Sequence, residues 1–396
     1  MSGQITRNNR VLVGKLESTY GVDANPTGAV NAIRVTDLSI KPVLGNQKRI
    51  NYIRGFLGIG RNVRTELYRS ITFKVDMVSA LTPGQAPPYG FILRACGMAE
   101  TLLAAAVTGT LQAGSTATTL KLPAAASAIN GAYIGAKSRI TGGLGSGQAA
   151  SGIAYDGVSK ILTLDRPLAT VPDGTSAVSI DPFARYNPIS DLGTMEAATF
   201  YYYTGNKVRH KLLGCRGNAK WDASSKDTGF IEFEMFGLYG GVADASEASV
   251  VTTNWVDPWE VGFGRTYGQF FGKQFTGGAT GLQMGKFSLD LGHKPKYRSV
   301  VGFQGINSTD RESTGSITLD ATLVAEQDIW AIVTGSTTGP IGIEQPDTNN
   351  GSVRLDVPKA DPTDADDGDD EGISINNIPF DCMPVLGNDE LYYTCR

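Results

Sequence analysis

The sequence is poor in the side chains that enzymes most often use for acid–base chemistry or metal binding. Its 396 residues include only two histidines, His210 and His293, and neither belongs to an H-E-x-x-H pair or a similar motif. We expect both histidines to lie in surface loops or at strand ends. The four cysteines are far apart and show no C-x-x-C spacing: Cys96, Cys215, Cys382 and Cys395. This pattern favours free thiols and argues against a metal site.

Motifs for phosphate binding and nucleophilic catalysis are also lacking. The stretch GRTYGQFFGKQ from Gly264 has Tyr267 where a phosphate loop needs glycine, and Gln274 where it needs serine or threonine. The stretch GLGSGQ from Gly143 is not a G-x-S-x-G nucleophile motif. We therefore expect a protein that is not an enzyme and that carries no cofactor and no metal.

Long apolar runs are missing as well. No segment approaches the ~18 consecutive apolar residues of a membrane span, and the opening MSGQITRNNR has no apolar core of a signal peptide. We expect a protein of a cytoplasm-like compartment without a membrane partner. The formal net charge is only −4, so the chain as a whole is not attracted to nucleic acid.

The composition that is present indicates a folded, β-rich protein. Apolar residues make up 41% and charged residues 19%, which is usual for a globular chain. The 49 glycines and 18 prolines are scattered without a period, as expected for many short strands joined by turns. The length suits two or three domains.

An internal repeat organises the chain. GFLGIGRNVRTELYRSITFKVDMV begins at Gly55, and GFQGINSTDRESTGSITLDATLV begins at Gly302. Each copy ends in an alternating strand, Ile71–Met77 in the first and Ile317–Leu323 in the second. A helix is expected after each strand, from Pro87 and from Ala325. An upstream match of LSI with FSL places Ser39 16 positions before Gly55 and Ser288 14 positions before Gly302. The repeat predicts a duplicated domain.

A segment rich in Ala, Gly, Ser and Thr interrupts the first copy between about residues 109 and 180. Its short alternating runs and the Asp-Gly pair at Asp156 predict a small inserted β-domain with a hairpin. The second copy lacks this segment, so we expect it on an exposed surface and dispensable for the repeated fold. The expected domains are 1–105 with 183–245, the insert 106–182, and 246–396.

Charge is distributed unevenly along the chain. Eight bases and one acid lie between Lys41 and Lys74, whereas thirteen acids and three bases lie between Glu344 and the last residue. Unlike charges favour contacts between different surfaces of neighbouring molecules, although both runs would also suit solvated faces. The candidate residues for such charge contacts between subunits are Arg61, Arg64, Arg69, Asp366, Asp367, Asp369 and Asp370.

Two further stretches leave alternatives open. The acidic run DPTDADDGDDEG from Asp361 could bind calcium, but its spacing fails the EF-hand pattern and favours a solvated loop. The same run could instead face a nucleic-acid duplex and repel its phosphates. The aromatic run FYYYTG from Phe200 could stack on bases or sugars, but packing at a strand edge is the favoured reading.

The chain resembles the major tail tube protein of long-tailed, non-contractile bacteriophages. The resemblance lies in VLVGKLESTYGVDANPTGAVNAIRVTDLSIKP from Val11 and YGFILRACGMAE from Tyr89, and it covers most of the chain. The segment GAYIGAKSRITGGLGSGQAASGIAYDG from Gly131 is similar to small β-domains of phage structural proteins. The resemblance implies a mainly β fold with two tandem tube-like sandwich or barrel domains, each with a flanking helix, and an inserted β-domain.

The function that this resemblance implies is structural. Tube domains of this family form rings of six around a channel for DNA, so a chain with two domains implies a trimer with pseudo-sixfold symmetry. The expected partners are further copies of the chain, a tape measure protein, tail terminator or tip proteins, and double-stranded DNA that passes without specific binding. The expected location is the virion tail, after assembly in the bacterial cytoplasm. The alternative is a tail-tip or receptor-binding component whose insert binds a host-surface glycan.

Overall fold

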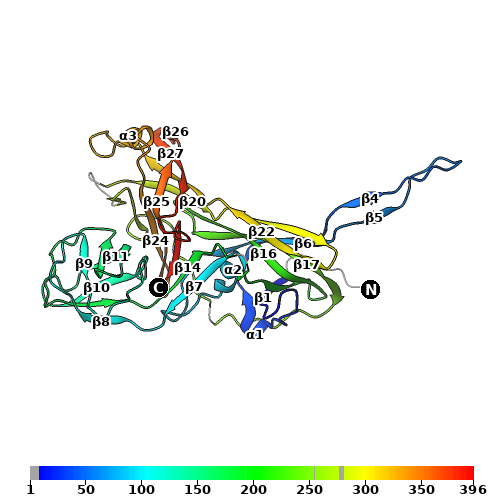
Figure 1. The fold of residues 1–396 in the computed structure, drawn as a ribbon, viewed down its shortest axis with the longest axis horizontal. Helices are drawn as coiled ribbons and strands as arrows, with labels where there is room; N and C mark the ends of the chain where they lie inside the picture. Colours follow the sequence, from blue (N-terminus) through cyan, green and yellow to red (C-terminus); the bar gives the residue numbers. More distant parts are fainter. Residues whose placement is uncertain (1–8, 192, 254, 276–280) are drawn as a thin grey trace.

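The computed structural model describes residues 9–191, 193–253, 255–275 and 281–396, and it is built mainly from antiparallel strands (Figure 1). The described residues include three short helices, α1 (Gly28–Asn31), α2 (Gly90–Ala95) and α3 (Ile329–Thr334). Most strands join one extended hydrogen-bonded network, and six others form a separate small sheet. The predicted mainly β class is confirmed.

The first large sheet contains seven antiparallel strands. Their order is β3-β6-β17-β16-β15-β1-β2. The strands are β1 (Arg10–Leu16), β2 (Ala32–Ile33), β3 (Thr36–Leu44), β6 (Tyr68–Asp76), β15 (Ala198–Thr204), β16 (Val208–Ser224) and β17 (Phe230–Asp244). In β6 the alternation predicted from the sequence is confirmed, because Ile71, Phe73 and Val75 are buried in the main core.

The second large sheet repeats the same order of pairings. Its strands run β20-β23-β27-β25-β24-β18-β19, and β26 adds a further pairing to β27. The strands are β18 (Tyr267–Phe270), β19 (Lys273–Gln274), β20 (Met284–Asp290), β23 (Thr314–Asp320), β24 (Gly339–Pro346), β25 (Ser352–Pro362), β26 (Asp366–Asp370) and β27 (Ile373–Cys382). The strands of the first sheet therefore follow one another along the chain in the same order as their counterparts in the second sheet.

The strand register gives a second way to align the two repeated blocks of sequence. Lys41 lies opposite Ser70, and Ser288 lies opposite Ser316, which matches Ser70 in the repeat. Lys41, not Ser39, is therefore the counterpart of Ser288. Lys41 precedes Gly55 by 14 positions, and Ser288 precedes Gly302 by 14 positions. The match of Ser39 with Ser288, which left a difference of two positions, is therefore replaced by a match of Lys41 with Ser288.

A hairpin projects between the matching strands of each copy. β4 (Gln47–Arg49) and β5 (Asn62–Arg64) lie between β3 and β6, and β21 (His293–Val300) and β22 (Phe303–Arg311) lie between β20 and β23. The first hairpin extends far from the body of the molecule at the right of Figure 1. The repeated G-F-x-G-I stretches lie in these hairpins.

Strand pairing also joins the two large sheets directly. Lys220–Ser224 at the end of β16 pairs antiparallel with Lys286–Asp290 of β20. On its other side the second sheet is extended by β28 (Tyr392–Cys395), which pairs with β25 and then with β14 (Phe183–Pro188), and β14 pairs with β7 (Met98–Leu103). The main hydrophobic core is continuous across both sheets for this reason.

The small sheet falls within residues 106–182 and has its own hydrophobic cluster. Its strand order is β8-β13-β10-β11-β12-β9. The strands are β8 (Val107–Thr110), β9 (Thr119–Lys121), β10 (Lys137–Gly142), β11 (Ala149–Asp156), β12 (Ile161–Leu164) and β13 (Ala177–Ile180). The expected hairpin joins β11 to β12, where the Asp156 carboxylate accepts hydrogen bonds from the Val158 N–H and the Ser159 hydroxyl.

Several local expectations need correction. The first predicted helix begins at Gly90 instead of Pro87, and the second begins at Ile329 instead of Ala325. β23 ends at Asp320, and Leu323 beyond it is exposed. The aromatic run from Phe200 belongs to β15, which lies between β1 and β16 and is no sheet edge. No helix in the described part of the chain is long and apolar enough to cross a membrane.

Candidate assembly surfaces

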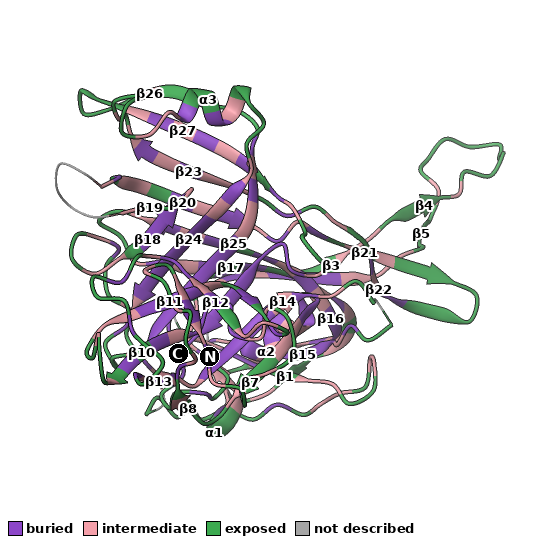
Figure 2. Cartoon of the chain, turned by 60° about the vertical axis from the view of Figure 1, so that its left-hand side comes forward, coloured by how far each residue is buried: buried purple, intermediate pink, exposed green. Residues whose placement is uncertain are grey.

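The most exposed feature of the molecule is the hairpin of residues 46–65, which we call the arm (Figure 2). Arg61 and Arg64 both lie on it, and both are exposed as expected for residues that meet another molecule. Its tip also carries large apolar side chains in solvent: Tyr52, Ile53, Phe56, Leu57 and Ile59. An isolated two-stranded hairpin with such a tip gains little from its own contacts, so the arm is suited to packing against a partner.

Arg69 does not belong to this exposed surface. It lies in β6 with its side chain fully buried, and its Nη1 donates a hydrogen bond of 2.9 Å to the Lys211 carbonyl. The guanidinium carbon lies 4.0 Å from the centre of the Tyr239 ring. Burial lowers the pKa of this guanidinium. Arg69 is used inside the molecule, and we remove it from the candidate contacts between subunits.

The acidic candidates form a strand where the sequence favoured a solvated loop. Asp366, Asp367, Asp369 and Asp370 are exposed residues of β26, which pairs with β27. Alternation along the strand points Asp366 and Asp370 to one face and Asp367 and Asp369 to the other. The carboxylates therefore do not converge on one cation, and no group of three or more metal-binding side chains was found among the described residues.

The structure places the basic and acidic candidates at different ends of one molecule. The arm extends from one side of the first sheet, whereas β26 lies at the outer end of the second sheet (Figure 1). Their charges cannot meet within one chain in this arrangement. They remain available to another copy, which is the arrangement that a head-to-tail contact requires.

A buried ion network fastens the small sheet to the second large sheet. Glu344 of β24 is almost fully buried, and its carboxylate lies 2.7 Å from Nη2 of Arg396 and 3.3 Å from Nζ of Lys137 in the small sheet. Burial alone would raise the pKa of Glu344, but the charges of Arg396, Lys137 and Arg354 outweigh it and hold the pKa well below its usual range.

Arg354 of β25 occupies the centre of this network. Its side chain is fully buried, and the guanidinium binds Asp356 at 2.8 Å and Asp165, which follows β12 of the small sheet, at 2.8 Å. Asp165 also accepts a hydrogen bond from the Ser151 N–H at 3.0 Å. Burial favours the neutral form of Asp165, but Arg354 and Arg166 reverse the effect and lower its pKa.

No sequence pattern predicts this network, because Asp165 and Arg354 lie 189 positions apart and each looks like an ordinary surface charge. A second polar attachment involves Arg185 of β14, whose Nη1 donates hydrogen bonds to the carbonyl oxygens of Gly131 and Ala132. The small sheet and its loops are thus fixed to the rest of the molecule by desolvated polar contacts, an arrangement that differs from a loosely attached surface module.

The histidines and cysteines have internal roles. His293 is the first residue of β21, and it is buried with its Nδ1 3.0 Å from the Gly217 carbonyl oxygen. Its strand-end position was predicted correctly, but its surface exposure was not. Burial lowers the pKa of both His293 and His210, and His210 lies near the start of β16. The four cysteines are buried free thiols.

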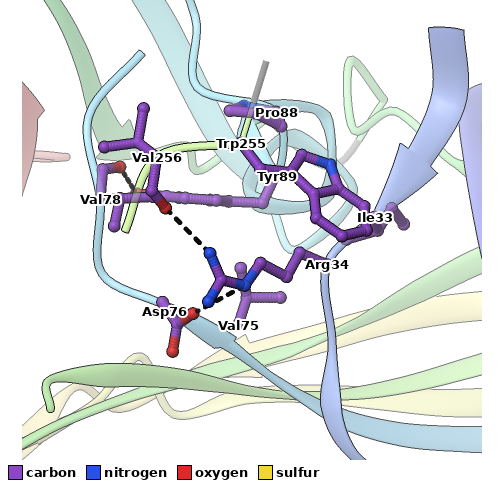
Figure 3. Close-up of a pocket in the computed structure, with 9 residues that line it drawn as sticks. All are labelled: Ile33, Arg34, Val75, Asp76, Val78, Pro88, Tyr89, Trp255 and Val256. Carbon is purple, nitrogen blue, oxygen red and sulfur yellow. Dashed lines mark hydrogen bonds and ion pairs between the residues drawn. The ribbon is translucent and has the colours of Figure 1, made fainter. Parts of the chain in front are cut away.

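A small apolar pocket lies where the segment after β17 meets the first sheet (Figure 3). Arg34 provides its main polar contacts, with a 3.5 Å ion pair to Asp76 and a 3.3 Å hydrogen bond to the Val256 carbonyl. Trp255 and Tyr89 complete the lining. Because Arg34 already has partners within the chain, we interpret the pocket as a packing contact between segments.

The stretch with partial likeness to a phosphate loop is a hairpin. Residues from Gly264 lead into β18, which turns through Phe271 and Gly272 into β19. A phosphate loop needs a helix whose first N–H groups face the anion, and here a strand follows instead.

Comparison with known proteins does not place the chain in a family. No protein-family model matches the sequence, and no curated protein shows a significant match.

Proposed function

We propose that this chain is a structural virion protein whose copies join head to tail into rings, and that the rings stack into the tube of a phage tail. The sequence resemblance to major tail tube proteins supports this assignment. The strand order supports it too, since the same seven-strand order occurs twice in one chain. The tube then serves as the channel through which DNA passes into the host.

The junction between the two large sheets carries the proposal. It joins the end of β16 in the first sheet to β20, the counterpart of β3, in the second. This contact uses different surfaces on its two sides, so it is heterologous. Heterologous contacts repeat from unit to unit and either close into a ring or continue as a filament. One contact between repeating units is thus already present within the chain.

The division of the chain follows from this proposal. Residues 1–105 and 183–245 form one tube-like unit, residues 246–396 form the other, and residues 106–182 form an insert between β7 and β14. If six units surround the channel, three chains complete a ring. Stacked rings would meet a tape measure protein inside, terminator and tip proteins at the ends, and DNA in transit, all within the virion tail.

Electron microscopy of the purified protein tests the proposal. We expect hollow tubes or rings with three chains each, visible by negative staining and countable by native mass measurement. A ring with six chains would show that the second unit does not occupy a ring position. A discrete trimer that binds host cells without polymerising would instead support the tail-tip alternative.

A further inference from the structure

β3 and β26 are edge strands of the two large sheets, and each lacks a partner on one side among the described residues. β3 pairs only with β6, and β26 pairs only with β27. Most residues of both strands are exposed. Unpaired edges offer rows of N–H and C=O groups to any further strand, so natural proteins cover them, blunt them or use them.

The internal junction shows how such edges can be used in this fold. At the contact of β16 with β20, Trp221 and Leu289 pair on the buried face of the sheet. On the open face, Lys220 lies 2.9 Å from Asp290, and Lys286 lies 3.0 Å from Asp222. The junction therefore combines strand pairing, a buried apolar face and crossed ion pairs.

β26 takes the position in the second sheet that the end of β16 takes in the first. The comparison of the two registers starts from Ile71 and Ile317, which match in the repeat. Ile71 lies on a strand that pairs with β17, and Ile317 lies on a strand that pairs with β27. On the next strand, Asn218–Asp222 of β16 then corresponds to Asp366–Asp370 of β26. Within one chain, the first segment has β20 as its neighbour and the second has none.

We propose that β26 of one molecule adds to the β3 edge of a second copy, and that this junction closes the ring. The proposal rests on the proposed function and names the surfaces that perform it. At the internal junction Asp222 lies opposite Ser288. The counterparts of these two residues are Asp370 and Lys41, so the transferred register places Lys41 of one molecule opposite Asp370 of the next.

Charge complementarity supports this partner. β26 presents four carboxylates, and β3 leads into the arm, whose base carries Lys48 and Arg49. The antiparallel register directs the base of the arm toward Asp366 and the acids before it. Opposite potentials on the two sides steer one orientation, and they disfavour pairing of β26 with another β26.

Proline limits the backbone part of the contact. Pro42 follows Lys41 in β3 and has no N–H to donate, as is common on edge strands. The junction between molecules therefore has fewer possible hydrogen bonds than the internal one. Charged side chains, with Lys41 and Asp370 at the centre of the contact, must therefore contribute a larger share of the free energy of association.

Charge exchange tests the pairing. Lys41→Glu and Asp370→Lys each place like charges opposite one another, and we expect each to raise the protein concentration needed for rings by at least about tenfold. The double variant restores an opposite pair and should recover assembly. Lys207→Glu and Glu326→Lys make the same charge changes at other exposed positions and should assemble normally. Additive losses in the double variant would overturn the proposal.

A cysteine pair tests the register independently. Opposite residues on neighbouring strands have Cβ atoms about 4.5–5.5 Å apart, close enough for a disulfide with small adjustment. Lys41→Cys with Asp370→Cys should give covalent oligomers on mild oxidation, and either variant alone should not, because the native thiols are buried. Rings that form without cross-links would place the junction elsewhere and leave the proposed function intact. Failure of the unmodified protein to form rings would reject both.

Discussion

At the scale of single residues, the burial of a charged side chain determines whether it can contact another molecule. Arg69 and Arg354 are both fully buried, yet only the second has carboxylate partners. Arg69 is held by one carbonyl oxygen and a tyrosine ring. A reversal of Arg69 to glutamate would bury an unpaired carboxylate and destabilise the fold, so it cannot report on contacts between molecules.

The ion network predicts a large difference between two aspartates of the insert. Asp165→Ala leaves Arg354 without one of its buried partners and should lower the free energy of unfolding by about 3–5 kcal/mol. Asp181→Ala breaks the ion pair with Arg139, whose side chain is 51% exposed, and should cost about 0–1 kcal/mol. Urea denaturation of the two variants measures both. Equal effects would show that the network contributes no more than a surface pair.

The same network makes stability depend on pH. Asp165 and Glu344 have pKa values below their ordinary 3.8 and 4.5, so the unfolded chain binds protons at a higher pH than the folded chain does. Their contribution is complete above the ordinary values and should be lost progressively below about pH 5. Glu344→Gln should flatten this part of the profile. The histidines, with lowered pKa values, act separately just below their ordinary 6.5.

Thermal melting between about pH 3 and 8 separates the carboxylate contribution from the histidine contribution. This range brackets the unperturbed carboxyl and imidazole pKa values of about 4 and 6.5. A decline confined to the histidine range, unchanged by Glu344→Gln, would contradict the role given to the carboxylates. A decline below about pH 5 that the variant reduces would support it.

At the scale of elements, the sequence predicted those strands whose pattern is local. The alternation of Ile71, Phe73 and Val75 identifies β6, and the repeated block identifies its counterpart β23. β26 could not be found in this way, because aspartate and glycine have low strand propensity and only the pairing with β27 holds them extended. Charges that meet across distant segments, as in the ion network, carry no local pattern at all.

The arm gives the clearest prediction at this scale. Replacing residues 47–64 by a short Gly/Ser turn removes an exposed hairpin and leaves the pairing of β3 with β6 in place. Thermal stability of the monomer should change little, by about 0.5 kcal/mol or less. Tube formation should be lost, because the exposed apolar tip no longer finds its partner. Normal tubes from the shortened protein would exclude the arm from assembly.

The basic residues of the arm can be tested without disturbing its shape. Arg61→Glu with Arg64→Glu reverses two exposed charges and should slow tube growth in light scattering. Growth of the unmodified protein should slow with salt, since surface charges act over ~8 Å at physiological ionic strength and ~3 Å at 1 M. A growth rate independent of salt, with normal growth of the double variant, would leave the charges as solvated faces.

At the scale of the whole molecule, the small sheet of residues 106–182, the proposed insert, has its own core and is also attached to the second large sheet. Its hydrophobic cluster is distinct from the main core, and it enters the chain between Leu103 and Phe183, which lie opposite each other on β7 and β14. A short turn can therefore join these strands directly. The insert nevertheless supplies Asp165 and Lys137 to the buried network, which the sequence did not indicate.

Deletion of residues 106–180 with a short joining turn should give a folded protein of reduced stability that still assembles. Removal of the insert takes away Asp165, but Arg354 keeps Asp356 and Glu344 keeps Arg396, so each remaining charge of the ion network retains a partner. Solvent reaches these pairs once the insert is gone, which reduces the cost of the charges that remain. β3 and β26 lie outside the deleted segment, and their junction should persist.

The comparison that decides this prediction is between the deletion and Asp165→Ala in the intact chain. In the intact variant the network stays buried and loses a charge, whereas in the deletion it becomes solvated and keeps its remaining pairs. We therefore expect rings from both proteins, with the arrangement of rings unchanged in electron micrographs of the deletion. A deletion protein that is folded by circular dichroism but forms no rings would make the insert an assembly element, and it would move the ring contact away from the strand edges toward the small sheet.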